Sequence, residues 1–181
     1  MICVTNITSH GIDFSYYSRF IAENEYRTDY RRFTVNRGDL LLSSSGNSWG
    51  KVAEYDSNEQ VILNTSTIRL NENRGANLQK GLMKWILQSD ATREQLGLMM
   101  TGACQPNFGP SHISKVAVAI PPKDEQVRIA HYLDSLTKRI DLLADKIAAG
   151  IEKLRQHRSA LISNAVTGQI DVRNYRAEVS E

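Results

Sequence analysis

The last third of the chain carries a long and regular pattern of apolar positions separated by polar ones. From residue 129 to residue 147 the apolar positions recur at alternating spacings of four and three residues, the pattern of a coiled-coil seam. Two successive steps of four residues then indicate a stutter that locally unwinds the supercoil. The pattern predicts one long helix with the seam residues Ile129, Leu133, Leu136, Ile140, Leu143, Ile147, Ile151, Leu154 and Leu161.

Both ends of this predicted helix are marked by residue type. Pro121 and Pro122 exclude helix before them, and Asp124 and Glu125 then fall in the first turn, where the helix dipole favours negative charge. Gly168 predicts the C-terminal stop. A helix over residues 124–167 would be roughly 66 Å long, about twice the diameter of a small domain. Such a helix cannot bury its seam against the preceding domain, so the sequence predicts pairing with a helix of another chain.

The first 120 residues combine short apolar runs, separated by turns, with two helical patterns. The turns between the runs favour antiparallel strands. We therefore expect an α+β (mixed α/β) domain over residues 1–120, one long coiled-coil helix over 121–168 and a tail over 169–181. The expected strands are 2–4, 40–42, 51–55, 61–63, 67–70 and 116–120, and the expected helices are about 78–86 and 91–100.

The charge of the chain is nearly balanced. It has 22 Lys and Arg residues against 20 Asp and Glu residues; residues 1–120 hold twelve and eleven of these, and the remainder ten and nine. Neither part is a basic tail, so any contact with nucleic acid must come from local patches. Cys3 and Cys104 show neither metal-binding spacing nor a disulfide framework, which indicates a reduced, cytoplasmic setting. The sequence shows no signal peptide and no apolar run that predicts a membrane span.

Three polar segments have the residue types that contact DNA. Arginines and tyrosines interleave over residues 16–32, which suits phosphate contact and base stacking, although a solvated surface with tyrosines packed on the domain is the alternative. The loop over residues 46–52 fails as a P-loop because it has three residues between its glycines and Val52 after Lys51. Its tip still offers polar and basic groups to a polyanion.

The third segment is the loop over residues 101–110, whose Gln and Asn side chains can make paired hydrogen bonds to adenine. Turn chemistry alone is the alternative explanation for such residues. The hypothesis assigns phosphate contacts to Arg31, Arg32, Lys51 and Arg74. It assigns base contacts to the two loops that carry Asn47, Trp49, Gln105 and Asn107.

No catalytic constellation emerges from the sequence. A thiol–imidazole pair between Cys104 and a histidine has no support in the local sequence. The zinc-deaminase signature is absent, and the residue before Pro121 is Ile120 rather than the Asn, Asp or Ser of an amino-methyltransferase tetrapeptide. No glycine-rich turn for an adenosyl cofactor is present. The sequence therefore predicts no active site, no metal and no cofactor.

Several motifs occur together along nearly the whole chain. They are Arg37-Gly38-Asp39-Leu40-Leu41, Gly46 with Gly50-Lys51, Gly102 with Gln105-Pro106-Asn107, Ile120-Pro121-Pro122-x-x-Glu125-Gln126-x-x-Ile129, and Ala165-Val166-Thr167-Gly168-Gln169-Ile170-Asp171-Val172-Arg173. In combination they resemble the specificity (S) subunit of type I restriction-modification enzymes. The proline-rich start of the helix and its Val-Thr-Gly end are the most specific of these motifs.

The resemblance implies a non-catalytic protein. In this family, a target recognition domain reads a few base pairs of double-stranded DNA and is joined to a helical spacer. The full-length family member has two such domains, held apart on a split site by two antiparallel helices. It docks methyltransferase subunits, which carry the adenosyl cofactor and modify adenine, and it directs restriction together with the nuclease subunit.

This chain departs from the family pattern in two ways. It has one recognition domain and one helix, and it lacks some tens of residues that should precede the first strand. The single helix implies a homodimer that rebuilds the two-domain arrangement and recognises a symmetric, interrupted site. The alternative is a truncated coiled-coil module that binds partner proteins and has lost its reading of DNA. A steep salt dependence of sequence-specific DNA binding would distinguish the first from the second.

Overall fold

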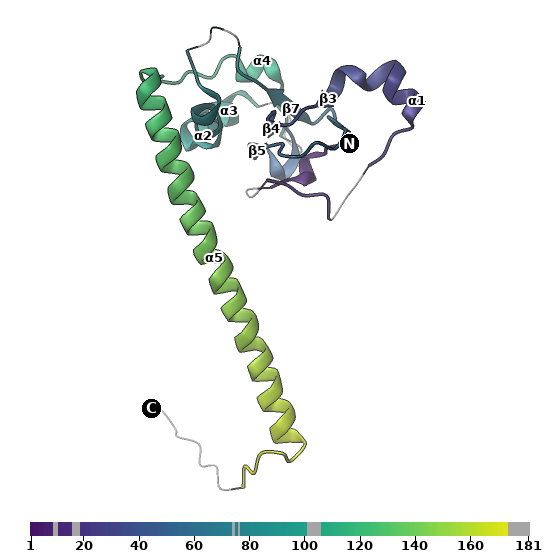
Figure 1. The fold of residues 1–181 in the computed structure, drawn as a ribbon, viewed down its shortest axis with the longest axis vertical. Coiled ribbons are helices and arrows are strands. Elements are labelled where there is room, and N and C mark those ends of the chain that lie inside the picture. The colour runs from purple at the N-terminus through teal and green to yellow at the C-terminus, as the bar shows by residue number, and fades with distance from the viewer. Residues whose placement is uncertain (9–10, 16–18, 74, 76, 101–105, 174–181) are drawn as a thin grey trace. The chain divides into compact units, whose positions relative to one another are not determined.

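The structure is a computed structural model that describes residues 1–8, 11–15, 19–73, 75, 77–100 and 106–173. The chain divides into two compact units, an N-terminal unit over Met1–Tyr132 and a C-terminal unit over Leu133–Glu181. The N-terminal unit contains small antiparallel sheets and short helices (Figure 1). The long helix α5 spans Lys123–Val166, so its first ten residues belong to the N-terminal unit. The predicted α+β class with one long helix is confirmed.

The central sheet is formed by three antiparallel strands in the order β5-β4-β7. These strands are β4 (Leu40–Ser43), β5 (Val52–Glu54) and β7 (Thr67–Leu70). Two further antiparallel pairs join β3 (Thr34–Val35) to β6 (Val61–Ile62) and β1 (Ile7–Thr8) to β2 (Gly11–Ile12). The strands predicted around residues 40–42, 51–55, 61–63 and 67–70 are therefore present.

Every residue of β4 is buried, because the strand supplies side chains to both faces of its sheet. Successive side chains of a strand point to opposite faces. Leu41 accordingly packs with Ile7, Val35 and Tyr55 in one apolar cluster. Leu42 packs in a second cluster together with Val52, Ile68, Leu87, Leu96 and Phe108. One strand thus connects the two apolar cores of the N-terminal unit.

Two helices cover the second core, at the positions expected from the sequence. Helix α2 spans Lys80–Gln88, and helix α3 spans Asp90–Met99. Ser89 lies between them and caps α3, because its hydroxyl accepts a hydrogen bond from the amide of Thr92 at 3.3 Å. Two short helices, α1 (Glu23–Glu25) and α4 (Pro110–Ile113), complete the helices of the described residues outside α5.

The strand predicted at residues 2–4 is wrong beyond its first residue. Ile2 makes an isolated parallel bridge to Leu63, but Val4–Asn6 forms a 3-10 turn. The side chain of Asn6 explains this turn. Its oxygen accepts from the amide of Cys3 at 2.9 Å, and its nitrogen donates to the carbonyl of Asp13 at 2.9 Å. A buried Asn that satisfies nearby backbone groups competes with strand formation.

The strand predicted at residues 116–120 is also wrong, because this segment is irregular. A glutamine side chain takes the place of a neighbouring strand. Gln95 accepts from the amide of Ala117 at 2.9 Å and donates to the carbonyl of Ala117 at 2.9 Å. Both backbone groups of Ala117 are therefore satisfied without a ladder, so the apolar run contributes no strand.

Helix α5 begins and ends within one residue of the predicted span 124–167. Asp124 and Glu125 lie in its first turn. At the other end Gly168 has a φ of 75°, and the amide of Gln169 donates to the carbonyl of Asn164 at 2.8 Å. This left-handed glycine ends the helix as expected. Beyond it, hydrogen bonds from Arg173 lower the pKa of the Asp171 carboxyl.

We predict that Leu41→Ala lowers the free energy of unfolding of the protein by about 2–5 kcal/mol, because it removes fully buried methyl groups and leaves a cavity. Urea unfolding followed by circular dichroism measures this change. The control is Leu98→Ala, at a side chain that is 89% exposed, which should change the free energy by less than about 0.5 kcal/mol. Equal effects of the two substitutions would contradict the two-core arrangement.

Candidate nucleic-acid interface

The loop between β4 and β5 contains three of the predicted DNA-contact residues, Asn47, Trp49 and Lys51. It folds as a 3-10 turn over Gly46–Ser48, flanked by glycines with φ values of 66° at Gly46 and 80° at Gly50. These left-handed conformations strain any residue with a Cβ atom, which explains the paired glycines. Asn47 and Lys51 are exposed, whereas Trp49 is half-buried.

A second predicted segment lies beside this loop. The amide of Gly46 donates to the carbonyl of Pro106 at 3.1 Å, and the amide of Phe108 donates to the carbonyl of Ser44 at 3.1 Å. A short antiparallel bridge pairs Ser45 with the intervening residue Asn107. Two segments about 60 residues apart in the chain are therefore held together by backbone hydrogen bonds.

This pairing brings two of the three candidate carboxamide residues, Asn47 and Asn107, onto adjacent segments. Asn47 and Asn107 are both exposed, and Asn107 sits next to Phe108, which is buried in the second core. The carboxamide of each Asn can donate and accept, as a paired contact with adenine requires. The loops are thus fixed by the core beneath them while the two carboxamides stay open to a ligand.

Trp49 is held by two neighbours rather than standing free. The guanidinium carbon of Arg93 lies 4.3 Å from the centre of the Trp49 ring. Phe108 meets the same ring edge-on, with ring centres 6.2 Å apart and an interplanar angle of 86°. One face of Trp49 is therefore occupied by a cation–π contact. Base stacking on that face would require Arg93 to move.

Arg93 is a candidate residue that the sequence interpretation did not include. It is exposed on α3, and stacking on Trp49 leaves the in-plane donors of its guanidinium available for a phosphate or a guanine edge. The sequence signal was slight, because one Arg on a helix resembles any solvated side chain. Only the packing of α3 against the β4–β5 loop brings Arg93 to the predicted segment.

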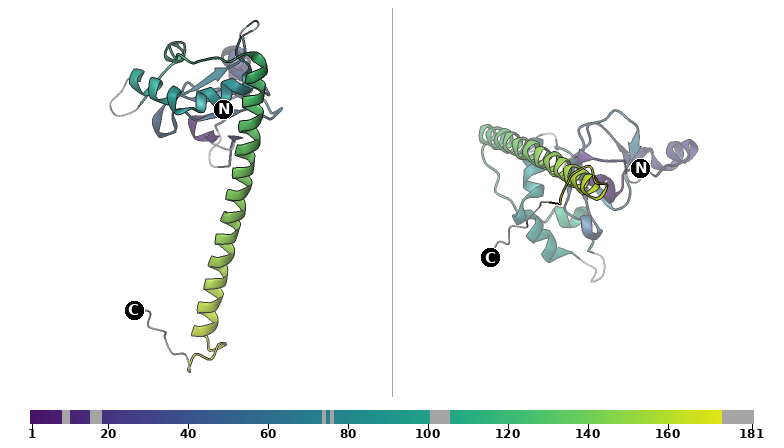
Figure 2. Two further views of the ribbon diagram at one scale, coloured as in Figure 1. Left: turned by 90° about the vertical axis from the view of Figure 1, so that its left-hand side faces the viewer. Right: turned by 90° about the horizontal axis from the view of Figure 1, so that it is seen from below.

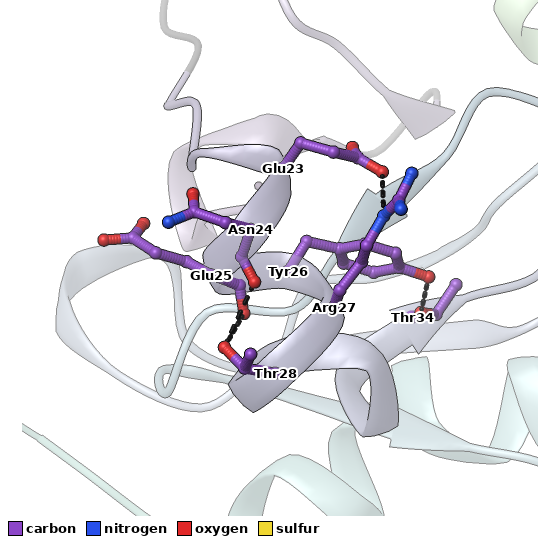
Figure 3. Close-up of polar contacts among 7 residues, drawn as sticks. All are labelled: Glu23, Asn24, Glu25, Tyr26, Arg27, Thr28 and Thr34. Carbon is purple, nitrogen blue, oxygen red and sulfur yellow. Dashed lines mark hydrogen bonds and ion pairs between the residues drawn. The ribbon is translucent and has the colours of Figure 1, made fainter.

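Arg31 and Arg32 belong to a different group of residues. Helix α1 continues into one π-helical stretch, Tyr26–Tyr30, and then into a 3-10 turn, Arg31–Phe33. Figure 3 shows how the polar contacts hold this segment. The hydroxyls of Tyr26 and Thr34 are 2.9 Å apart, and Arg27 donates to Glu23 at 2.9 Å. The segment is partly helical, and its charged side chains are exposed.

An open, arginine-rich pocket of about 460 Å³ lies along this segment. Its lining contains three arginines and one aspartate, a composition that suits an anion such as a phosphate. The guanidinium of Arg32 also lies 4.8 Å from the centre of the Phe33 ring. The pocket is lined by Arg27, Thr28, Asp29, Arg31 and Arg32, and Asn47, Trp49, Lys51 and Asn107 are not part of that lining.

Other basic residues near the site are committed to contacts within the domain. Arg69 on β7 donates to the carbonyl of Thr34 and lies 3.7 Å from the buried carboxylate of Asp39. Lys80 pairs with Glu54 at 2.6 Å. The predicted contact residues Arg74 and Gln105, like Cys104, lie outside the described residues.

The described part of the chain shows neither a metal site nor a membrane-spanning helix. Its His, Cys, Asp and Glu residues form no group of three or more that could hold a metal ion. None of its helices combines the length and the apolar character that crossing a membrane requires.

Comparison with known families assigns the chain. Residues 4–153 match the family described as the type I restriction modification DNA specificity domain. The match covers most of the chain, so the protein belongs to this family. It includes every candidate contact residue discussed above and the first 31 residues of α5. A search of curated proteins found no match.

Proposed function

We propose that this chain is the DNA sequence-recognition component of a type I restriction-modification system. It reads one part of a split DNA target and has no catalysis of its own. Adenine methylation and restriction are performed by the methyltransferase and restriction subunits that dock on it. The family assignment supports a role in DNA specificity, and the separate features of the structure support the finer parts of the proposal.

The single observation that carries the DNA-reading role is the pairing of Ser44–Gly46 with Pro106–Phe108. It places two exposed carboxamides on neighbouring segments of the chain. Lys51 belongs to the same loop, and Arg93 contacts that loop through Trp49. Carboxamides specify bases, whereas cations on the rim contact phosphates and orient the protein. The arginine pocket at Arg31 and Arg32 supplies a second, sequence-independent contact with the DNA backbone.

Helix α5 supports assembly as a homodimer. From Leu136 onward the seam side chains of the C-terminal unit are exposed, from 38% at Leu136 to 69% at Leu154. A contiguous apolar surface of this kind marks an interaction site. A second copy of the same helix presents the same seam, so a two-fold pair would cover both. The two recognition domains of such a dimer would read a symmetric, interrupted target.

Co-expression with a type I methyltransferase subunit from the same source tests the proposal. If the two proteins co-purify and methylate adenine in a defined split motif, the chain is a working recognition component. Association without methylation would leave docking intact but remove the DNA-reading role. Failure to associate at all would favour the alternative of a coiled-coil interaction module.

We predict different effects for base contacts and phosphate contacts. Asn47→Ala or Asn107→Ala should weaken the binding free energy by about 1–3 kcal/mol at one position of the target and relax specificity there.

Arg31→Ala or Arg32→Ala should weaken binding to all sequences alike and reduce the slope of log affinity against log salt concentration by about 1. Fluorescence anisotropy with single-position variants of the target at several salt concentrations measures both effects.

The matched control for these substitutions is Arg173→Ala, at an exposed arginine beyond α5 that pairs with Asp171 at 2.7 Å. It should leave both the affinity and the salt slope unchanged. If Asn107→Ala weakened every sequence equally, the assignment of Asn107 to base reading would be wrong.

We predict that Leu143→Asp together with Ile147→Asp converts the dimer to a monomer, because two charges would be buried in an apolar seam. Sedimentation velocity measures the change in mass. Leu142→Asp is the matched control, because Leu142 is 52% exposed and lies next to the seam but outside it. A wild-type chain that sediments as a monomer at micromolar concentration would remove the homodimer from the proposal.

A further inference from the structure

Gln126 is a buried polar residue near the start of α5, within the N-terminal unit. Its relative exposure is 0%, although it lies in the first two turns of a helix whose neighbouring side chains are exposed. Its side-chain oxygen accepts from the amide of Gln79 at 2.8 Å. Its nitrogen donates to the carbonyls of Asn77 at 2.6 Å and Pro121 at 2.8 Å.

These three hydrogen bonds join two places in the chain that are nearly 50 residues apart. Gln79 is the residue immediately before α2, and Pro121 lies two residues before the start of α5. Backbone groups at such positions have no helical partner of their own. A glutamine satisfies all three because its carboxamide both accepts and donates, which neither Glu nor an apolar residue can do.

A close contact between helices lies one turn further along α5. Ala130 is buried, and a Cβ atom placed on Gly81 of α2 would lie 3.3 Å from the Cβ of Ala130. The second turn of α5 therefore lies close beside the start of α2 (Figure 2), where a side chain larger than that of glycine would make a tight contact. Gln126 and Ala130 are therefore two contacts, one turn apart, between the start of α5 and the segment of α2 within the N-terminal unit.

We propose that Gln126 is a positioning residue that sets the spacing between the two halves of the DNA target, through the direction in which α5 leaves the recognition domain. The inference rests on the proposed function, because spacing has meaning only for a dimer that reads two half-sites. Gln126 itself touches no DNA in this proposal.

Helix length gives a small change at Gln126 a large effect. From Gln126 to the end of α5 is about 60 Å at 1.5 Å per residue. A tilt of about 3° at the start therefore moves the far end by about 3 Å, which is close to the rise of one base pair. Selecting one spacer length over lengths one base pair longer or shorter thus requires the direction of the start of α5 to be fixed to within a few degrees.

The test uses the full chain co-expressed with its methyltransferase subunit, and it maps methylated adenines across the host genome by sequencing. This readout gives the half-site sequences and the spacer length separately. The wild-type protein should methylate one spacer length. Gln126→Glu keeps the acceptor for Gln79 but loses both donors. It should methylate the same half-sites while its preference for that spacer over lengths one base pair longer or shorter falls by at least about tenfold.

A second variant perturbs the same junction without touching Gln126. Gly81→Ala adds a methyl group that α5 must accommodate by a few tenths of an ångström at Ala130. Alanine favours the helical conformation of α2, so this variant should remain folded. A shift of that size, one turn from Gln126, tilts the axis by about 3°. The preferred spacer should therefore change by one base pair or broaden.

Each variant has a matched control. Gln156→Glu makes the same change at an exposed glutamine of α5, and Gly97→Ala makes the same change in α3 where a Cβ atom meets nothing within 4 Å. Both controls should keep the wild-type spacer.

The outcomes separate the inference from the proposed function. An unchanged spacer preference in folded Gln126→Glu and Gly81→Ala proteins would overturn the inference alone. So would loss of all methylation by folded variants that still co-purify, since it would assign the junction to assembly rather than spacing. Absence of methylation by the wild-type pair would overturn the proposed function and this inference with it.

Discussion

The two-sided burial of β4 is the constraint on which the N-terminal unit depends. A strand of four residues whose two faces are both buried must be all apolar or small, and Leu40–Ser43 meets this condition. Because Leu41 and Leu42 enter different cores, neither core can shift without the other. The chain leaves β4 directly into the loop that carries Asn47. The candidate interface is therefore built on the most constrained strand of the domain.

Most of the regular structure was predictable because its signals are local. The seam of α5, its acidic first turn and its glycine stop lie within single stretches of sequence, and so do the apolar runs of β4 and β7. The two wrong strands failed for a non-local reason. At each of them one polar side chain, Asn6 or Gln95, satisfies backbone groups that a strand would otherwise pair. A pattern of apolar positions does not contain that information.

The candidate site was predictable in its residue types but not in its arrangement. Asn47 and Asn107 were singled out for their chemistry, and the pairing of the segments that carry them emerges only from the fold. Trp49 was assigned to a base-contacting loop, and the structure adds that Arg93 covers one face of its ring. Gln126 belonged to a motif that was used only to recognise the family, and its burial explains why that motif needs a carboxamide. Long-range pairing of this kind is invisible to spacing rules.

If α5 pairs with a second copy as proposed, the stability of the helix depends on the concentration of the protein. A helix gains most of its stability from the packing of its apolar face, and that face is exposed from Leu136 to Leu161 in the single chain. If a second copy covers this face, the free energy of unfolding of the helix rises with the concentration of the protein. Newly made chains would then stay open to proteolysis until enough copies accumulate. The concentration of the protein, rather than a separate regulator, would then determine when the paired form of the recognition component is present.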